Sequence, residues 1–184
     1  DYYVAISQAT RNELVQHGKK CTLVNHGVIL PLEKQIKPNK KIKRIGYVGR
    51  FTQSKGLHTL LKAFKLISEI NDELDLVIWG EGKLKNEILT FIKVNNIADR
   101  VKLYPPSTEL NNIYSSFDCL VVPSESLEGF GLVIIEAMSY GIPVVVSDLP
   151  VFLETVENYK NGLIFKRGDY KDLSEKIIEL TEKN

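Results

Sequence analysis

Short apolar runs alternate with longer amphipathic stretches through most of the chain. The short runs predict β-strands, and the stretches between them repeat apolar residues at intervals of three and four, which is the spacing of one helix face. Leu57, Leu60, Leu61 and Phe64 form the first such stripe. After residue 40, the predicted strands are 42–48, 74–79, 101–104, 119–122, 143–146 and 163–165.

The predicted helices lie between these strands and after the last of them. A final stripe of Leu173, Ile177 and Leu180 predicts a C-terminal helix, for which we expect Asp169 to be the N-cap. Strands such as 144–146 are apolar on both faces, so they need helices on both sides of their sheet. The predicted fold class is therefore α/β, a doubly wound parallel sheet with helices on both faces. Its ligands are expected beyond the carboxyl ends of the strands.

Composition is that of a soluble globular domain. The chain has 184 residues, of which 43% are hydrophobic and 26% charged, and a chain of this size can bury a core without disulfides or structural metal. Cys21 and Cys119 lack CxxC spacing, which favours two core residues in a reducing compartment. The apolar runs are far shorter than the ~20 residues that span a bilayer, and the first residues do not resemble a signal peptide. We therefore expect a cytoplasmic protein.

A basic stretch at residues 33–44 precedes the regular alternation of strands and helices. It holds six basic residues and one acidic residue, whereas the net charge of the chain is +1. No aromatic residues interleave the lysines, so we interpret the stretch as a solvated connector and not as a nucleic-acid or membrane-binding segment. Two strand-like runs, 3–6 and 21–24, come before it. We therefore divide the chain into a lead-in, residues 1–39, and a main domain, residues 40–184.

The loop after the first strand of the main domain carries two cations. It reads GRFTQSKG over residues 49–56, with Arg50 at the strand tip and Lys55 at the start of the next helix. A cation in the first helical turn opposes the helix dipole by ~0.3–1 kcal/mol. The placement makes sense if Arg50, Lys55 and the helix N-terminus share an anion. An ordinary pair of solvated side chains is the alternative, and this loop alone leaves both interpretations open.

The loop after the fourth strand combines glycines with two glutamates. Gly129 and Gly131 allow the backbone to approach a ligand where a helix begins, and the amides of Gly131 and Leu132 would point outward. Glu136 then lies in a helix that is apolar nearly all round, where a carboxylate needs hydrogen-bond partners. The two hydroxyls of a ribose would satisfy it. Glu128 precedes the glycines and can reach the other end of the same ligand.

These residues resemble the retaining nucleotide-sugar glycosyltransferases of the two-domain GT-B fold, specifically glycosyltransferase family 4. The resemblance rests on Glu128 and Glu136, which have seven residues between them within EGFGLVIIEAM, followed by GIPVVVS. It extends through GRFTQSKG, LVIWGEG, LETV and NGLIF, and so covers roughly residues 40–181. The lead-in resembles the family's interdomain segment. There Asn25 and His26 stand where many members have Pro-Asn, and we expect His26 to face the cleft.

The resemblance implies a role for each matched position in binding a nucleoside-diphosphate sugar. Glu128 is the candidate catalytic residue, acting at the transferred sugar, and Glu136 would bind the ribose hydroxyls. Two cations and the backbone of the glycine turn would hold the diphosphate and the adjoining sugar: Arg50, Lys55, Phe130, Gly131 and Leu132. No cofactor or metal is expected, because fixed cations and a helix N-terminus can stabilise the leaving diphosphate, and the three histidines lack metal-ligand spacing.

The resemblance also implies that residues 40–184 form a donor-binding domain and that the N-terminal acceptor domain is absent from this chain. The acceptor, a glycan or a lipid-linked sugar, would be bound mainly by that missing domain. Contact with the inner membrane face would be made only through the full-length protein. The chain alone is therefore expected to bind a donor but to transfer no sugar.

Other function classes explain less of the pattern. A glycosidase also uses two carboxylates but has no use for Arg50 and Lys55. A dinucleotide-binding dehydrogenase would carry GxGxxG after its first strand, whereas Gly129 and Gly131 lie elsewhere and lack the third glycine. A GT-B nucleotide-sugar epimerase, which would need catalytic acids in its partner domain, stays open. A non-catalytic nucleotide-binding α/β module also stays open, although an interaction module of this fold leaves the charged residues unexplained.

Overall fold

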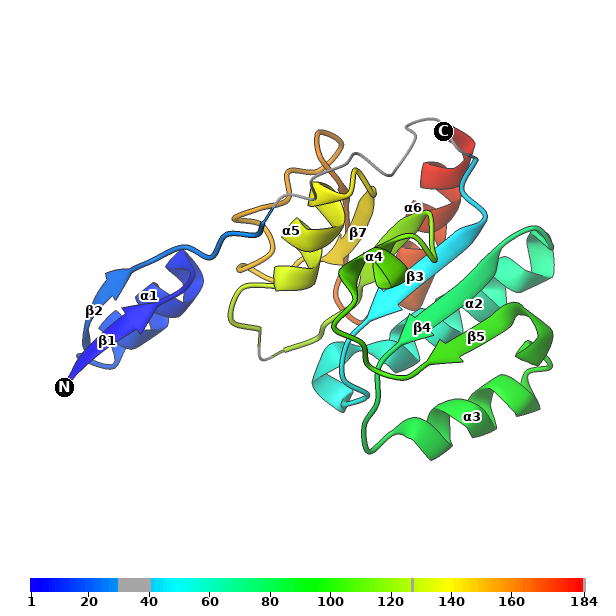
Figure 1. Cartoon of the computed structure of the whole chain (residues 1–184), viewed down its shortest axis with the longest axis horizontal. Helices are drawn as coiled ribbons and strands as arrows, with labels where there is room; N and C mark the ends of the chain where they lie inside the picture. The colour runs from blue at the N-terminus through cyan, green and yellow to red at the C-terminus, as the bar shows by residue number, and fades with distance from the viewer. Residues whose placement is uncertain (30–40, 127, 184) are drawn as a thin grey trace.

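A six-stranded sheet forms the centre of the molecule in the computed structural model, which describes residues 1–29, 41–126 and 128–183. All neighbouring strands are parallel and follow the order β5-β4-β3-β6-β7-β8, which confirms the predicted parallel sheet (Figure 1). The strands are β3 (Arg44–Val48), β4 (Asp75–Trp79), β5 (Val101–Tyr104), β6 (Cys119–Val122), β7 (Val144–Ser147) and β8 (Leu163–Phe165).

Helices cover both faces of this sheet, as predicted. Buried residues of α2, α3 and α6 form the core on one face, and those of α4 and α5 form the core on the other. Asp169 Oδ1 accepts hydrogen bonds from the amides of Lys171 and Asp172, which confirms it as the cap of α6. Within the described residues, no helix combines the length and the apolar character needed to cross a membrane. The helices are α2 (Leu57–Ile70), α3 (Lys85–Val94), α4 (Leu110–Tyr114), α5 (Leu132–Ser139) and α6 (Tyr170–Lys183), with single 3₁₀ turns η1 (Gln53–Lys55) and η2 (Ala98–Arg100).

The strand order changes direction beside β3. From β3 the chain moves through β4 to β5 at one edge of the sheet. It then returns to β6 on the other side of β3 and continues to β7 and β8. The loops that follow β3 and β6 therefore leave the sheet in opposite directions and open a crevice at the carboxyl ends of these strands. These are the two loops in which the sequence places the charged candidate residues.

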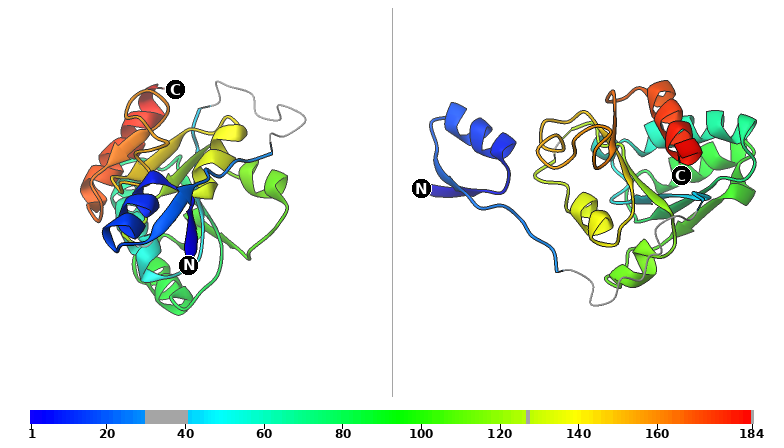
Figure 2. Two further views of the ribbon diagram at one scale, coloured as in Figure 1. Left: turned by 90° about the vertical axis from the view of Figure 1, so that its left-hand side faces the viewer. Right: turned by 90° about the horizontal axis from the view of Figure 1, so that it is seen from above.

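The lead-in forms a small unit of its own. It contains β1 (Tyr2–Ala5), α1 (Gln8–Gln16) and β2 (Lys20–Leu23), and the two strands pair in parallel. Figures 1 and 2 show it to one side of the main sheet, near α5 and the loop between β7 and β8. The sequence does not predict α1, because none of its side chains is buried and no apolar stripe marks it. Most of the basic stretch and the division after residue 39 lie outside the described residues.

Strand β3 begins two residues later than predicted, and a side chain binds the amides at its start. Asp118 Oδ2 accepts hydrogen bonds from the amides of Lys43 at 3.1 Å and Arg44 at 2.9 Å, and Oδ1 accepts one from Arg44 Nη2 at 2.8 Å. Burial alone would raise the pKa of the Asp118 carboxyl. The hydrogen bonds and charge of Arg44, with the Lys43 amide, outweigh burial and lower that pKa below its ordinary value of 3.8.

We expect Asp118→Asn to lower the free energy of unfolding by about 1–2 kcal/mol at pH 7. The lower part of this range is expected, because the Arg44 side chain is 35% exposed and water screens the ion pair. Since the pKa of Asp118 is lower in the folded state, its contribution is complete above the unfolded pKa and is lost as the pH falls through the folded one. Urea unfolding at pH 7 and at about pH 3 should therefore show a smaller difference between wild type and variant in acid.

The matched control is Glu73→Gln, which removes one partner of an exposed ion pair with Lys41. It should leave the free energy of unfolding nearly unchanged, because water screens an exposed pair. A difference between wild type and Asp118→Asn that is equally large at both pH values would contradict the ion-pair explanation.

Candidate functional site

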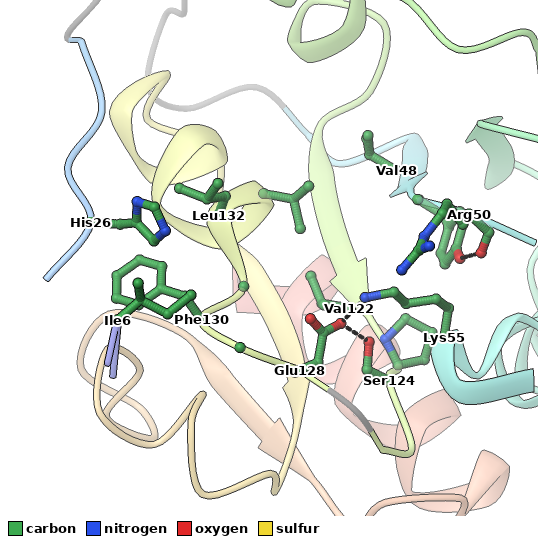
Figure 3. A pocket seen from close by; sticks show the side chains of 16 residues that line it. Ile6, His26, Val48, Arg50, Lys55, Val122, Ser124, Glu128, Phe130 and Leu132 are labelled. Atoms are coloured by element: carbon green, nitrogen blue, oxygen red, sulfur yellow. Dashed lines mark hydrogen bonds and ion pairs between the residues drawn. The ribbon is translucent and has the colours of Figure 1, made fainter. Parts of the chain in front are cut away.

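A pocket of about 350 Å³ lies at the carboxyl ends of β3 and β6 (Figure 3). Its walls come from three parts of the chain: the loop after β3, the loop after β6 with the start of α5, and the lead-in. The candidate residues that line it are Arg50, Lys55, Glu128, Phe130, Gly131 and Leu132, and the lead-in adds Ile6 and His26. The structure thus brings together every predicted site residue except Glu136.

An ion pair joins the two loops inside this pocket. Lys55 Nζ lies 2.5 Å from Glu128 Oε1, and the Ser124 hydroxyl donates to the same oxygen at 2.6 Å. The side chains of Lys55 and Glu128 are only 18% and 11% exposed. In Figure 3 the nitrogen ends of Arg50 and Lys55 point toward the same part of the pocket. One carboxylate and two cations therefore converge where the strand order reverses.

Backbone contacts hold the two loops against each other. The amide of Glu125 donates to the Ser54 carbonyl at 2.8 Å, and the Thr59 hydroxyl donates to Glu125 Oε1 at 2.6 Å. Gly56 has φ +63°, and a Cβ at this position would lie 1.8 Å from the Pro123 carbonyl oxygen. Only glycine permits this approach, so the sequence GRFTQSKG places Lys55 beside the second loop.

Gly131 sets the start of α5 at the pocket wall. Its φ is +85°, and a Cβ would lie 2.7 Å from Phe152 Cε1. It is the N-cap residue of α5, and no side chain caps this helix end. The amides at the N-terminus of α5 therefore face the pocket without a side-chain acceptor, which is an arrangement that favours an anion.

Arg50 and Tyr47 also line the pocket. Arg50 is exposed, and its carbonyl accepts a hydrogen bond of 3.0 Å from the buried Tyr47 hydroxyl. Burial, with a smaller effect of the Glu128 charge, raises the pKa of Tyr47 well above its ordinary value. Tyr47 therefore stays a neutral hydrogen-bond donor that fixes the backbone at Arg50.

The lead-in supplies the wall opposite these cations. His26 lines the pocket as expected, and its ring lies 5.4 Å from that of Phe130 in an edge-to-face arrangement. The Ile6 side chain packs on Gly129, with Cδ1 3.1 Å from the position of a Cβ there. The candidate site therefore includes residues of the lead-in.

Glu136 does not line this pocket. It lies in the second turn of α5, where the Tyr114 hydroxyl donates to Oε2 at 2.6 Å. Burial, followed by this hydrogen bond to Glu136, raises the pKa of Tyr114, so the phenol keeps its proton. A carboxylate in so apolar a helix needs a hydrogen-bond partner, and Tyr114 is that partner for Glu136. The contact of Glu136 with a ribose stays a prediction.

A second pocket of about 230 Å³ adjoins the first. The two share Val48, Gly49 and Arg50, and the second extends along the ends of β4 and β5 to Trp79 and Pro106. The two pockets lie side by side along the edge where the strands end. No three His, Cys, Asp or Glu side chains lie close enough to hold a metal ion in the described part of the chain.

Comparison with known proteins identifies the family. Residues 30–184 match Glycosyl transferases group 1. The chain belongs to this family. The capsular polysaccharide biosynthesis glycosyltransferase CapM of Staphylococcus aureus is 28% identical over 198 residues, which cover 96% of this chain and 51% of that protein. The chain spans about half the length of the curated relatives it matches.

Solved structures show the fold of this chain. TarM of S. aureus, in complex with fondaparinux, alpha-GlcNAc-glycerol and UDP, matches 97% of this chain with a TM-score of 0.89 at 24% identity, over 36% of its own length. Anabaena Alr3699/HepE, in complex with UDP and glucose, matches 98% of this chain with a TM-score of 0.86 at 22% identity, over 53% of its length. The six-stranded sheet is therefore the Rossmann-like domain of the GT-B fold.

Three residues around the site of this member of the glycosyl transferases group 1 family were not predicted from the sequence. Ser124 could have been suspected, because a hydroxyl two residues after a buried strand lies at the ligand-binding edge of a parallel sheet. Tyr47 and Tyr114 fit apolar stripes and give no polar signal in the sequence. Their hydroxyls are recognised only when the fold shows what they contact.

We expect Gly131→Ala to lower the free energy of unfolding by about 2–4 kcal/mol. About 1–2 kcal/mol comes from the left-handed backbone and the rest from overlap of the new methyl group with Phe152. The control is Gly141→Ala, because Gly141 has φ +72° but nothing within 4 Å of a Cβ. Chemical denaturation should show the smaller loss for Gly141→Ala, and equal losses would rule out the overlap.

Proposed function

We propose that this chain is the donor-binding domain of a retaining glycosyltransferase, which transfers a sugar from a nucleoside-diphosphate sugar to a glycan or lipid-linked acceptor. The observation that carries the proposal is the paired Lys55 and Glu128 beside Arg50, at the N-terminus of α5 and at the reversal of strand order. This combination offers positive charge to a diphosphate and a carboxylate to the attached sugar. Family membership supports the same reaction class.

The diphosphate would lie among Arg50, Lys55 and the α5 amides. Cleavage of the bond to the sugar develops negative charge on the departing nucleoside diphosphate. Two fixed cations and an uncapped helix N-terminus stabilise that charge without the reorganisation that water would need. We therefore propose a reaction that needs no divalent metal, with no cofactor beyond the donor itself.

Glu128 would orient the transferred sugar and stabilise positive charge that develops on it. Lys55 and Ser124 both donate to Glu128 Oε1, and hydrogen bonds of this kind make a carboxylate a weaker nucleophile. A retaining reaction then proceeds without a covalent sugar–enzyme intermediate, with the leaving diphosphate assisting deprotonation of the acceptor on the same face of the sugar. In this role Glu128 is a catalytic residue because it touches the sugar.

The nucleoside would extend from the diphosphate through the two adjoining pockets toward β4 and β5. Glu136 would bind the ribose hydroxyls through the oxygen that does not accept from Tyr114, and the base would enter the second pocket. UDP is the first nucleotide to test, since TarM and Alr3699/HepE were both solved with it. A domain outside this chain would bind most of the acceptor, in a cytoplasmic enzyme that meets the inner membrane face only as the whole protein.

We expect the 184-residue chain to bind UDP in the presence of a chelator and to transfer no sugar. UDP at about 100 times its dissociation constant should stabilise the fold by about 2.7 kcal/mol, which raises the midpoint of thermal unfolding by roughly 5–10 °C. Thermal unfolding with UDP, with and without EDTA, measures this. Binding that disappears with EDTA would contradict the metal-free proposal, and no UDP binding at millimolar concentration would contradict the nucleotide site.

The two charged residues should separate phosphate from ribose recognition. Lys55→Ala is expected to weaken UDP binding about 10- to 100-fold and to leave uridine binding unchanged, because only UDP presents charge to the lysine. Glu136→Gln is expected to weaken both ligands by a similar factor, because the ribose is common to them. Calorimetric titration measures both, with Lys65→Ala as the control because Lys65 pairs with Glu69 on α2. Equal losses for UDP and uridine in both site variants would contradict the assignments.

A further inference from the structure

The N-terminus of α1 is bound by a side chain of the main domain. Glu154 Oε2 accepts a hydrogen bond from the amide of Gln8 at 2.7 Å, and Oε1 accepts one from the amide of Ala9 at the same distance. Glu154 lies in the segment between β7 and β8, 145 and 146 residues from these two partners. A single carboxylate therefore links the lead-in to the donor domain.

This contact completes the cap of α1. Ser7 is the N-cap residue and is fully buried, and its hydroxyl oxygen accepts from the amide of Thr10 at 3.1 Å. Glu154 binds the two preceding amides, so the first three amides of the helix all have acceptors. The first turn of α1 contains no acidic residue of its own. Glu154 thus supplies the negative charge that a helix N-terminus favours, and supplies it from another part of the chain.

The same end of the lead-in rests on the glycine turn of the donor site. The Thr10 hydroxyl donates to the Gly129 carbonyl at 3.4 Å, and Ile6 packs on the same glycine. Residue 129 directly follows Glu128 and precedes Phe130, whose ring contacts His26. The contact of Glu154 with the N-terminus of α1 therefore lies next to the contacts between the lead-in and the glycine turn.

We propose that Glu154 is a positioning residue of the donor site: by binding the N-terminus of α1 it holds the lead-in against residues 128–131 and so keeps Glu128 and the Gly131 turn in place. The proposal rests on the proposed function only in calling the pocket a donor site. Its physical content, coupling between Glu154 and residues 128–131, does not depend on any ligand. Glu154 does not line the pocket itself, so we assign it no direct contact with a ligand there.

Amide hydrogen exchange of the 184-residue chain tests the coupling. Glu154→Ala should speed exchange at residues 8 and 9 by about tenfold and should also speed it at residues 129–131. Glu154→Gln keeps the shape and one acceptor oxygen, so its effect should be smaller at both places. Glu157→Ala is the control, because Glu157 lies in the same surface segment and pairs with Lys160. Unchanged exchange in β3 and β6 would show that each variant is folded.

A double mutant decides whether the effect passes through the lead-in. Ile6→Ala removes the lead-in side chain that packs on Gly129, while Glu154 is unchanged. If the lead-in transmits the effect, Glu154→Ala with Ile6→Ala should speed exchange at residues 129–131 no more than the larger single change. Exchange that rises only in α1, or effects at residues 129–131 that simply multiply, would overturn the proposal. Because no ligand is present, this failure is distinct from a failure to bind UDP.

Discussion

Strand β3 has β4 on one side and β6 on the other, so the loops that follow β3 and β6 diverge at one edge of the sheet. The charged part of the candidate site follows from this arrangement. The first loop brings Lys55, the second brings Glu128, and the approach of Gly56 to Pro123 sets how close the two loops come. The helix α5 begins at the same edge, so its N-terminus adds positive potential where Arg50 and Lys55 already lie.

Stability alone is a weak reason for the Lys55–Glu128 pair. The two side chains are 18% and 11% exposed, so both lose most of their hydration, and their attraction offsets that loss only with good geometry and further hydrogen bonds. Apolar residues of similar size would often serve a fold equally well. A donor diphosphate and its sugar would give each ion a second partner, which accounts for charges in a place where packing does not need them.

The sequence predicts most of the sheet because its strands are apolar runs with clear ends. Strands β5, β6 and β8 have the predicted bounds. All four residues of β6 are apolar and buried, so its limits are clear in the sequence, whereas β5 is an edge strand with Lys102 and Tyr104 exposed. Predictions failed where a contact distant in sequence decides the outcome. Asp118 binds the amides at the start of β3, and Glu154 caps the α1 helix that no apolar stripe marks. For the same reason the Tyr114 partner of Glu136 becomes visible only in the folded chain.

The basic stretch divides the chain by composition, but the candidate site uses residues from both sides of that stretch. Ile6 and His26 come before that stretch, yet both line the pocket whose charged wall comes from the main domain. No side chain of α1 is buried, and the position of the lead-in depends on its contacts with the donor domain, which include Glu154, the Thr10 hydroxyl and Ile6. The backbone of the loop that carries Arg50 and Lys55 is fixed on the sheet side, by the Tyr47 hydroxyl at the Arg50 carbonyl and by the Glu125 amide at the Ser54 carbonyl. Segments that pack on a domain from outside open at a lower free-energy cost than its core does. The donor pocket therefore has one side formed by loops of the sheet and one side formed by the lead-in, and Glu154 of the donor domain binds the lead-in.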